Sequence, residues 1–552
     1  MAERGRTWII LIGGVFLCAG LGLVSVHVPF GRDQGVSAYV AEVMAQGGVV
    51  YRDVYHFNFP GIFFAYLLAR FIPLPFPESV NLFHVTLVLL TYLAVYAAAR
   101  QLLKKEVAAL AGFFYGAFSV VMYTDYWDIA QKESLACLPL ALCLLASFKA
   151  LPAANQTNGG LLKEPKQNRS KIGWAALAGL FAGFAAQFKP TLAIVLIACL
   201  YPAFAGLKWR KPGFKSLGAA AAGFVISFVP LLLYLLSTDS LGAMAESVFR
   251  FGGFYGGQSY QGLSHVLKKS SGNLVSWLYE WRFLVVLSVA ALVSYRKSGD
   301  LRIRLLLVFG LLLLFQVIVQ MKFFTYHWIP LLLPASVMAA AGAAYIARAA
   351  KTKTAPGGIS GPREKSYRAV IVLVLFALFL GNLVPSGKRY KRELLYDLGM
   401  IAERDFLSAY GSWGGGDISP LASQAVADYI KENASPGEPV LVFGLEPGLY
   451  IAAERFAPTR FAYDQPLVTR PRGNDAFRAY RSRLRSEFLS DISENPPVYI
   501  IVIENDATSI EPQESYEQMK EFASFYELVK RDYFLENKIE DYFIYRRLRG
   551  GD

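Results

Sequence analysis

Repeated apolar runs of about twenty residues constrain this chain more than any other feature of its sequence. The runs are separated by short clusters of lysine and arginine, and 54% of the 552 residues are hydrophobic. An α-helix needs about 20 apolar residues to cross the roughly 30 Å hydrocarbon core of a bilayer. The sequence therefore predicts a polytopic α-helical membrane protein.

The basic clusters predict the topology, because the cytoplasmic loops of membrane proteins carry an excess of lysine and arginine. About eleven spans, with the N-terminus in the cytoplasm, place every basic cluster on the cytoplasmic side. The predicted spans are 8–26, 80–99, 107–123, 135–148, 172–188, 191–207, 217–236, 281–294, 305–320, 328–347 and 370–384. The net charge of +13 comes mostly from these clusters, so it indicates topology and not nucleic-acid binding.

One apolar segment does not fit this alternation. Residues 61–73 (GIFFAYLLARFIP) are too short to span a bilayer, and Arg70 interrupts them, so we expect an interfacial helix. Counting this segment as a span would move the next basic cluster, which begins at Arg100, to the outer side. A longer outer loop is expected at 237–280.

The chain becomes polar after residue 385. Amphipathic helices are predicted at 419–434 and 477–492, buried strands at 439–443 and 497–503, and a closing hairpin at 526–547. This order of elements indicates a small α/β domain. We therefore expect a membrane domain, 1–385, and an extracytoplasmic α/β domain, 386–552.

The first outer loop, residues 27–60, is the main candidate for a functional segment. It is too polar to span a bilayer, and it holds two separated acids, Asp33 and Asp53. Apolar residues recur at helical spacing between Tyr39 and Met44, so we expect a helix between the two acidic clusters. Acids, amides and an imidazole at a membrane surface suit chemistry on a lipid-linked substrate. The alternative is a solvated loop whose charges only face water.

Further polar residues follow on the same outer side, where charges near bilayer depth are costly and often functional. Asp33 is the candidate catalytic residue. The candidate substrate-binding or donor-binding residues are Gln34, Arg52, Asp53, His56, Asn58, Asp125, Asp128, Lys132, Glu133, Lys189, Lys322 and His327. Structural alternatives stay open for two of them: Lys189 as a boundary lysine that reaches the interface, and His327 as a member of an aromatic belt.

Sequence motifs predict neither a definite cofactor nor a definite metal site. Asp125 and Asp128 resemble a carboxylate pair but have no third ligand in sequence reach, so the metal stays unknown and a divalent ion is left open. The four cysteines lie in apolar runs, and no Walker, Rossmann or nucleophile-elbow motif is present. Chemistry would therefore rest on carboxylates, which suits general-base activation of a hydroxyl for sugar transfer.

Three short stretches carry a resemblance to a known superfamily. They are GRDQ at 31–34 with YRDVYHFNFP at 51–60, the acidic turn with Glu133, and KFFTYHWIPLLLP at 322–334. In these stretches the chain resembles bacterial glycosyltransferases of the GT-C superfamily, close to the protein-mannosyltransferase and aminoarabinose-transferase group. The resemblance implies an enzyme of the bacterial cytoplasmic (inner) membrane that uses a polyprenyl-phosphate-linked sugar donor and inverts the anomeric centre. The acceptor would be an extracytoplasmic glycan, lipid or protein.

The resemblance also implies a role for Asp33, which matches the loop acid that acts as the base. Two departures affect the donor site. The family often has Asp-Glu where this chain has Asp33-Gln34, and it commonly has a lysine near the position of Asn58. Lys189, Lys132 or Arg52 would then contact the donor phosphate in place of that lysine.

Two other classes of protein stay in consideration. A lipid or polysaccharide transporter or flippase would also have many spans and buried charges, but the two halves of the sequence show no internal repeat. A non-catalytic envelope-assembly protein would use the soluble tail as a binding module. A neutral effect of substituting Asp33 would favour the latter.

Overall fold

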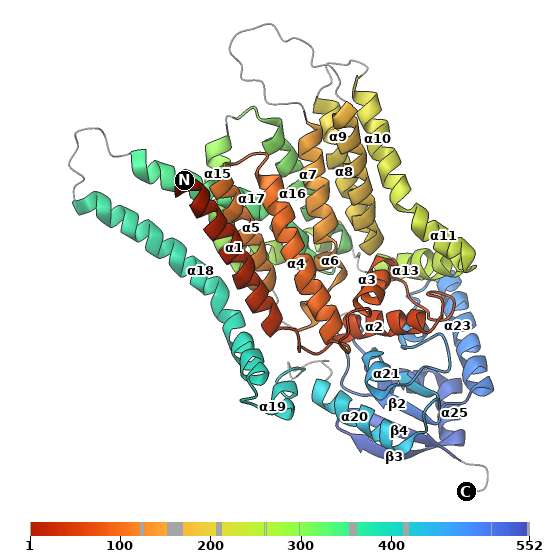
Figure 1. Ribbon diagram of the computed structural model, residues 1–552. Coiled ribbons are helices and arrows are strands. Elements are labelled where there is room, and N and C mark those ends of the chain that lie inside the picture. The colour runs from red at the N-terminus through yellow and green to blue at the C-terminus, as the bar shows by residue number, and fades with distance from the viewer. Residues whose placement is uncertain are drawn as a thin grey trace.

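The computed structural model describes residues 2–121, 126–151, 169–205, 212–258, 260, 262–296, 298–352, 362–411, 419–508 and 511–548. In these ranges a bundle of long helices stands on a smaller domain of short helices and one sheet (Figure 1). The C-terminal residues lie in the smaller domain, which packs against one end of the bundle.

Apolar helices, most of them long, pack side by side to form the bundle. They are α1 (Ala2–Val24), α4 (Glu78–Ala99), α5 (Lys105–Val121), α6 (Lys132–Leu135), α7 (Cys137–Ala150), α8 (Arg169–Phe188), α9 (Leu196–Ala205), α10 (Pro212–Ser227), α11 (Val229–Ser237), α15 (Arg282–Tyr295), α16 (Leu301–Gln320), α17 (Leu332–Thr352) and α18 (Pro362–Asp397), with the short turns η1 (Tyr126–Asp128), η2 (Pro190–Val195) and η4 (Thr325–Leu331). Gly179 of α8 lies so close to the backbone of Ala220 in α10 that a side chain there would clash. Such close approach at small residues is how membrane helices gain packing energy.

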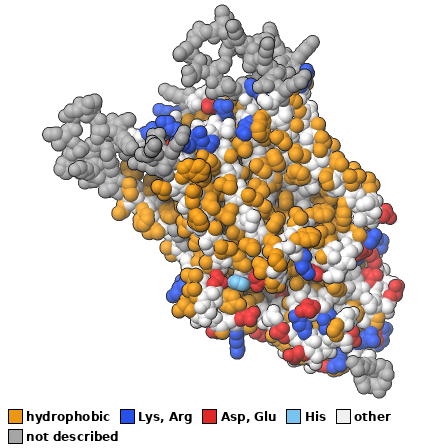
Figure 2. All heavy atoms as spheres, in the orientation of Figure 1, with side chains coloured by type: hydrophobic (Ala, Val, Ile, Leu, Met, Phe, Trp, Pro, Cys, Tyr) orange, Lys and Arg blue, Asp and Glu red, His pale blue; other side chains and the backbone are white. Residues whose placement is uncertain are grey.

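Among the described residues, seven helices are long and apolar enough to cross a bilayer, and up to nine if two bent pairs each count as one span. These nine coincide with nine of the predicted spans. The other two predicted spans correspond to α5, with 17 residues, and to the shorter apolar helix Pro190–Pro202. Figure 2 shows apolar side chains over the middle of the bundle and charged side chains toward its two ends, as expected of a surface that faces lipid.

The expected loop at 237–280 is helical in the structure. It contains α12 (Leu241–Met244), the π-helix η3 (Ala245–Phe251), α13 (Gly252–Gly257) and α14 (Leu263–Glu280). The axis of α14 makes an angle of 94° with that of α15. The segment still connects the predicted spans 217–236 and 281–294, and apolar residues recur every three or four positions in α14, as in an amphipathic helix.

The soluble part is an α/β domain, as predicted. Its elements are α19 (Glu403–Leu407), α20 (Pro420–Asn433), β1 (Val440–Phe443), α21 (Gly448–Ala453), α22 (Gln465–Val468), α23 (Asp475–Glu494), β2 (Tyr499–Ile503), α24 (Ser515–Glu521), α25 (Ala523–Asp532), β3 (Tyr533–Ile539) and β4 (Tyr542–Arg547). The sheet order is β1-β2-β4-β3, with β1 parallel to β2 and the other pairs antiparallel. Every residue of β1 and β2 is buried, which explains their continuous apolar sequences.

One helix in this region extends into the predicted hairpin, and another crosses the predicted domain boundary. The predicted closing hairpin begins at Tyr533 and not at Tyr526, because α25 buries Phe525 and Val529 one turn apart and so continues as a helix. Helix α18 runs across the expected domain boundary at residue 385 and bends by 58° between Asn382 and Ser386. The division into two domains at that residue stays a prediction.

The first outer loop lies between the bundle and the soluble domain (Figure 1). It contains α2 (Arg32–Ala45), and it leads into α3 (Gly61–Ala69), whose nine residues are too few to cross a bilayer. Gly35 of α2 contacts Gly448 of α21 so closely that a Cβ would come within 2.9 Å of the Gly448 nitrogen. One turn further along α2, the hydroxyl of Tyr39 accepts a hydrogen bond from the Ala457 amide at 3.0 Å. Because residues four apart share one face of a helix, these two contacts hold one face of α2 against the soluble domain.

Candidate active site

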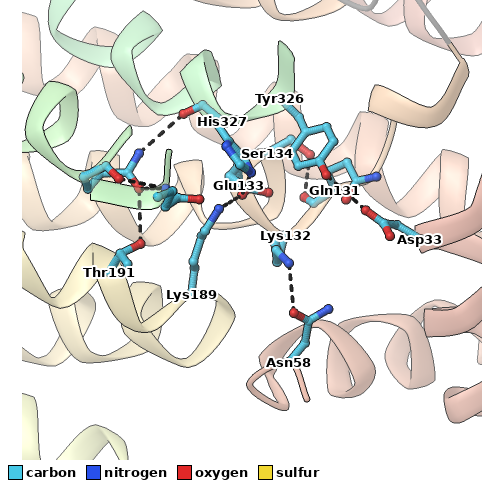
Figure 3. A network of polar contacts seen from close by, with 12 residues as sticks. Asp33, Asn58, Gln131, Lys132, Glu133, Ser134, Lys189, Thr191, Tyr326 and His327 are labelled. Atoms are coloured by element: carbon cyan, nitrogen blue, oxygen red, sulfur yellow. Dashed lines mark hydrogen bonds and ion pairs between the residues drawn. The ribbon is translucent and has the colours of Figure 1, made fainter. Parts of the chain in front are cut away.

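Asp33 lies in the first turn of α2 (Figure 3). Its side chain is exposed, and its Oδ2 accepts a hydrogen bond from the Tyr326 hydroxyl of η4 at 3.1 Å. The neighbouring Gln34 is buried, and its amide donates to the carbonyls of Tyr126 and Ile129 at 3.2 and 2.8 Å. Gln34 therefore fixes the start of α2 against η1 while the Asp33 carboxylate stays accessible to a ligand.

A buried ionic cluster lies near Asp33 and joins three elements (Figure 3). Glu133 of α6, Lys189 at the start of η2 and His327 of η4 are 0%, 8% and 3% exposed. The Lys189 ammonium donates to Glu133 Oε1, and His327 Nε2 lies 3.5 Å from the same oxygen. Pro190 disfavours helical geometry at Lys189, so α8 ends there and the lysine has extended backbone.

Lys132 connects the bundle to the end of the first outer loop. Its ammonium donates to Asn58 Oδ1 at 3.0 Å, and the Tyr51 hydroxyl donates to the Asn58 carbonyl at 2.8 Å. His56 is buried, and its Nδ1 accepts from the Asn58 amide at 2.9 Å. Burial, with a smaller contribution from the charge of Lys132, lowers the pKa of His56 to about 3. His56 is therefore neutral at physiological pH and orders the Asn58 turn.

Lys322 lies in the loop between α16 and η4, where its ammonium is 3.5 Å from the ring centre of Tyr255 in α13. Burial is the main cause that lowers the pKa of Lys322 to about 7. The positive charges of Lys132 and Lys189 lower it further, and the negative charge of Asp33 opposes them. The three lysines and Asp33 therefore share one electrostatic environment, with the lysines as its positive side.

Some predicted site residues lie outside the group that Asp33 forms with the three lysines. Arg52 and Asp53 are partly exposed and pair with each other at 2.8 Å, and Arg52 also donates to the Thr238 carbonyl at 3.2 Å. Asp128 is buried in η1, within electrostatic range of Tyr326. The predicted pair of Asp125 and Asp128 includes one residue, Asp125, that lies outside the described residues.

The part of the chain that the structure describes contains no group of three His, Cys, Asp or Glu side chains arranged to hold a metal ion. Sequence reasoning missed polar residues of the soluble domain near Asp33. They are Tyr463, Asp464, Asp506 and Glu511. Tyr463 ends the stretch TRFAY at 459–463, which resembles the tails of GT-C enzymes, whereas no motif marks Asp464, Asp506 or Glu511. Only their place in the folded domain brings them to the site.

A cavity of about 930 Å³ lies beside α2, between the bundle and the soluble domain. Gly31 and Arg32, the two residues before Asp33, line it together with the proline-rich segment 72–77. Acidic side chains contribute to its wall, among them Glu42 and Glu446. A ligand of several sugar units would fit a cavity of this size.

No family model matches the chain, and no curated protein matches it at a significant level. Solved structures do match over nearly the whole chain. ArnT from Cupriavidus metallidurans, in the apo state, superposes with a TM-score of 0.58 and 11% identity, covering 99% of both chains. This chain has a GT-C fold. The fold suspected from the stretches around Asp33, Glu133 and Lys322 is therefore confirmed.

A second GT-C structure agrees with this assignment. The oligosaccharyltransferase of Archaeoglobus fulgidus, tethered to an acceptor peptide, has a TM-score of 0.50 and 11% identity, covering 98% of this chain and 75% of its own. Both matches cover the soluble domain as well as the helix bundle of this chain. At this identity the likeness concerns the fold alone.

Proposed function

We propose that this protein is a glycosyltransferase of the bacterial cytoplasmic membrane that moves a sugar from a polyprenyl-phosphate donor to an extracytoplasmic acceptor. One observation carries the proposal. An accessible carboxylate, Asp33, shares its electrostatic environment with Lys132, Lys189 and Lys322 at one end of the helix bundle of a GT-C fold. A base beside a group of cations is what a reaction with an anionic leaving group requires.

Asp33 acts as the general base in this proposal. An acceptor hydroxyl is a poor nucleophile at neutral pH, so a carboxylate that takes its proton accelerates the attack. The acceptor oxygen forms a bond to the anomeric carbon while the bond from that carbon to the phosphate oxygen breaks, and the configuration inverts. The hydrogen bond from Tyr326 and the buried amide of Gln34 hold the base in place.

The lysines stabilise the departing phosphate. Negative charge develops on the phosphate oxygens in the transition state, and fixed cations nearby stabilise it. Lys189 is already paired with Glu133, whereas Lys322 contacts an aromatic ring and Lys132 a neutral amide. Breaking these contacts to bind a phosphate therefore costs less free energy for Lys322 and Lys132 than breaking the ion pair costs for Lys189.

The acceptor reaches Asp33 through the cavity beside α2. Its lining residues Gly31 and Arg32 precede Asp33 directly, so an acceptor bound there ends next to the base. The acceptor is a glycan, a lipid or a protein. The oligosaccharyltransferase of similar fold was solved with an acceptor peptide.

Product analysis tests the proposed function. The purified protein is added to liposomes that contain the lipid-linked sugars of its native host and an envelope extract as acceptor. The expected result is release of polyprenyl phosphate, detected by mass spectrometry, with the sugar recovered on the acceptor. Movement of an intact donor between the leaflets would instead indicate a flippase, and an unchanged donor would indicate an assembly protein.

Reporter fusions test the proposed orientation. A fusion after Lys166 is expected to report the cytoplasm and a fusion after Ser419 the opposite compartment, because all basic clusters then lie inside. Alkaline phosphatase and green fluorescent protein activities give complementary signals. The same compartment for both positions would contradict the topology, and with it the extracytoplasmic location of Asp33.

Donor binding is expected to weaken as the pH rises through about 7. The pKa of Lys322 is lowered to about 7, so its ammonium is charged below this pH and neutral above it. Binding that needs the charged form weakens about tenfold per pH unit above the pKa. The Michaelis constant for the donor between pH 6 and 8.5 measures this effect. Lys322→Arg should remove most of the pH dependence, because arginine stays charged, and an unaltered profile would exclude Lys322 as the titrating group.

A further inference from the structure

Several buried polar atoms of the soluble domain have no hydrogen-bond partner among the described residues, and three of these belong to side chains that interact electrostatically with one another. These three are the hydroxyl of Tyr463, Oε1 of Glu511 and Oδ1 of Asp464. Tyr463 and Asp464 are each only 2% exposed. Buried polar atoms in folded proteins nearly always have a partner, so an unpartnered set in one place points to a ligand.

These atoms lie next to the proposed active site. The Tyr463 hydroxyl interacts electrostatically with Glu511, with Asp464 and with Asp33. Lys322 is within electrostatic range of both Asp33 and Glu511. Gln465 hydrogen bonds to the side chains of both Tyr255 and Glu511, which ties the soluble domain to the ring that Lys322 contacts.

The remaining oxygens of this acidic cluster already have partners. The Ser515 hydroxyl lies 2.9 Å from Asp464 Oδ2 and 2.6 Å from Asp506 Oδ2, so its single proton is donated to one of them and it accepts from the other, while its amide donates to Asp506 Oδ1 at 2.8 Å. The Asp506 carbonyl accepts from the Arg32 guanidinium at 3.1 Å. Within the part of the cluster that the structure describes, the three unpartnered atoms therefore remain for a ligand.

The chemistry of the three atoms selects the kind of ligand. A tyrosine hydroxyl needs an acceptor for its proton, and a carboxyl oxygen needs a donor when it is ionised or an acceptor when it is protonated. Burial and the neighbouring acids raise the pKa of both Asp464 and Glu511, so a carboxyl of this cluster can hold a proton. A sugar hydroxyl is both donor and acceptor, so adjacent hydroxyls of one sugar satisfy all three atoms. An ammonium group only donates and would leave the proton of Tyr463 without an acceptor.

We infer that Tyr463, Asp464 and Glu511 form a subsite that binds the hydroxyl groups of the sugar being transferred. The inference rests on the proposed function. The transferred sugar is attached directly to the donor phosphate, so it lies beside Lys322 when the lysines hold that phosphate. The soluble domain thus recognises the donor sugar, and the membrane domain supplies the base and the cations.

A comparison of two ligands tests the subsite. Binding to the purified full-length protein is measured for the polyprenyl-phosphate sugar and for polyprenyl phosphate, which lacks the sugar. Tyr463→Phe and Glu511→Gln are each expected to lower the preference for the sugar donor over polyprenyl phosphate about tenfold, the loss of one good hydrogen bond. Tyr526→Phe, at a partly exposed tyrosine on α25, is the matched control and should not change this preference.

The possible outcomes distinguish a failure of the proposed subsite from a failure of the proposed function. Equal binding of the sugar donor by wild type and both variants, or an equal loss for both ligands, would overturn the subsite. Absence of transfer by the wild-type protein, with an intact preference for the sugar donor, would overturn the proposed function and support the subsite. Thermal unfolding of each variant verifies that the protein is folded.

Discussion

Replacing Asp33 by asparagine is expected to lower sugar transfer by about 10²–10⁴-fold, the usual contribution of a general base. Asparagine keeps the size of the side chain and still accepts the hydrogen bond from Tyr326, but it cannot take a proton from the acceptor. Because Asp33 is exposed and makes few contacts, expression, thermal stability and donor binding should stay near those of wild type. Initial rates of transfer in reconstituted membranes measure the effect.

Asp53→Asn is the matched control for this substitution. Asp53 lies in the same loop, but it pairs with Arg52 and accepts from the Val49 amide at 2.8 Å, so its replacement should leave transfer largely intact. Near-normal transfer by Asp33→Asn together with a large loss of transfer in Asp53→Asn would show that Asp53, and not Asp33, is the base. Near-normal transfer by both variants would exclude both carboxylates as the base.

Removing Glu133 alone is expected to destabilise the protein by about 3–5 kcal/mol, because Glu133→Leu leaves the buried ammonium of Lys189 without its partner. The double variant Glu133→Leu, Lys189→Met should recover most of this loss, since apolar residues of similar volume often replace a buried ion pair without a net cost. Thermal unfolding of the detergent-solubilised proteins measures both effects.

The double variant also separates stability from activity. If Lys189 contributes charge to the donor phosphate, the double variant is stable but binds the donor more weakly than wild type. Wild-type donor affinity in the stable double variant would show that the pair is purely structural. Similar stability of the single and double variants would contradict the pairing of Glu133 with Lys189.

The fold class could be predicted from local sequence because the bilayer leaves few solutions. A run of about twenty apolar residues in lipid satisfies its backbone hydrogen bonds only as a helix, and lysines and arginines orient it. Nine predicted spans accordingly coincide with candidate spans of the structure. The connection expected at 237–280 contains helices, because apolar residues recur at helical spacing in a segment that is too polar overall for a span.

In the candidate site, too, local sequence predicted some features and only the tertiary structure shows the others. The alternation of the predicted spans placed Asp33, Glu133, Lys189, Lys322 and His327 on one side of the membrane. Short sequence stretches around several of these residues suggested the superfamily. The alternation of spans does not specify the distances between these side chains or their hydrogen-bond and ion-pair partners. Only the tertiary structure shows that Glu133 pairs with Lys189 and lies close to His327, and that Arg52 pairs with Asp53.

The sequence by itself determined that this chain spans a membrane as a helical bundle, carries a soluble α/β domain and holds a candidate base at Asp33. Tertiary structure alone decided that Tyr463 and Glu511, more than 400 positions later in the chain, lie in the environment of Asp33. The physical reason is the range of the interactions. Hydrophobic periodicity is written in neighbouring residues, whereas hydrogen bonds and charge pairs in a site join segments that only packing brings together.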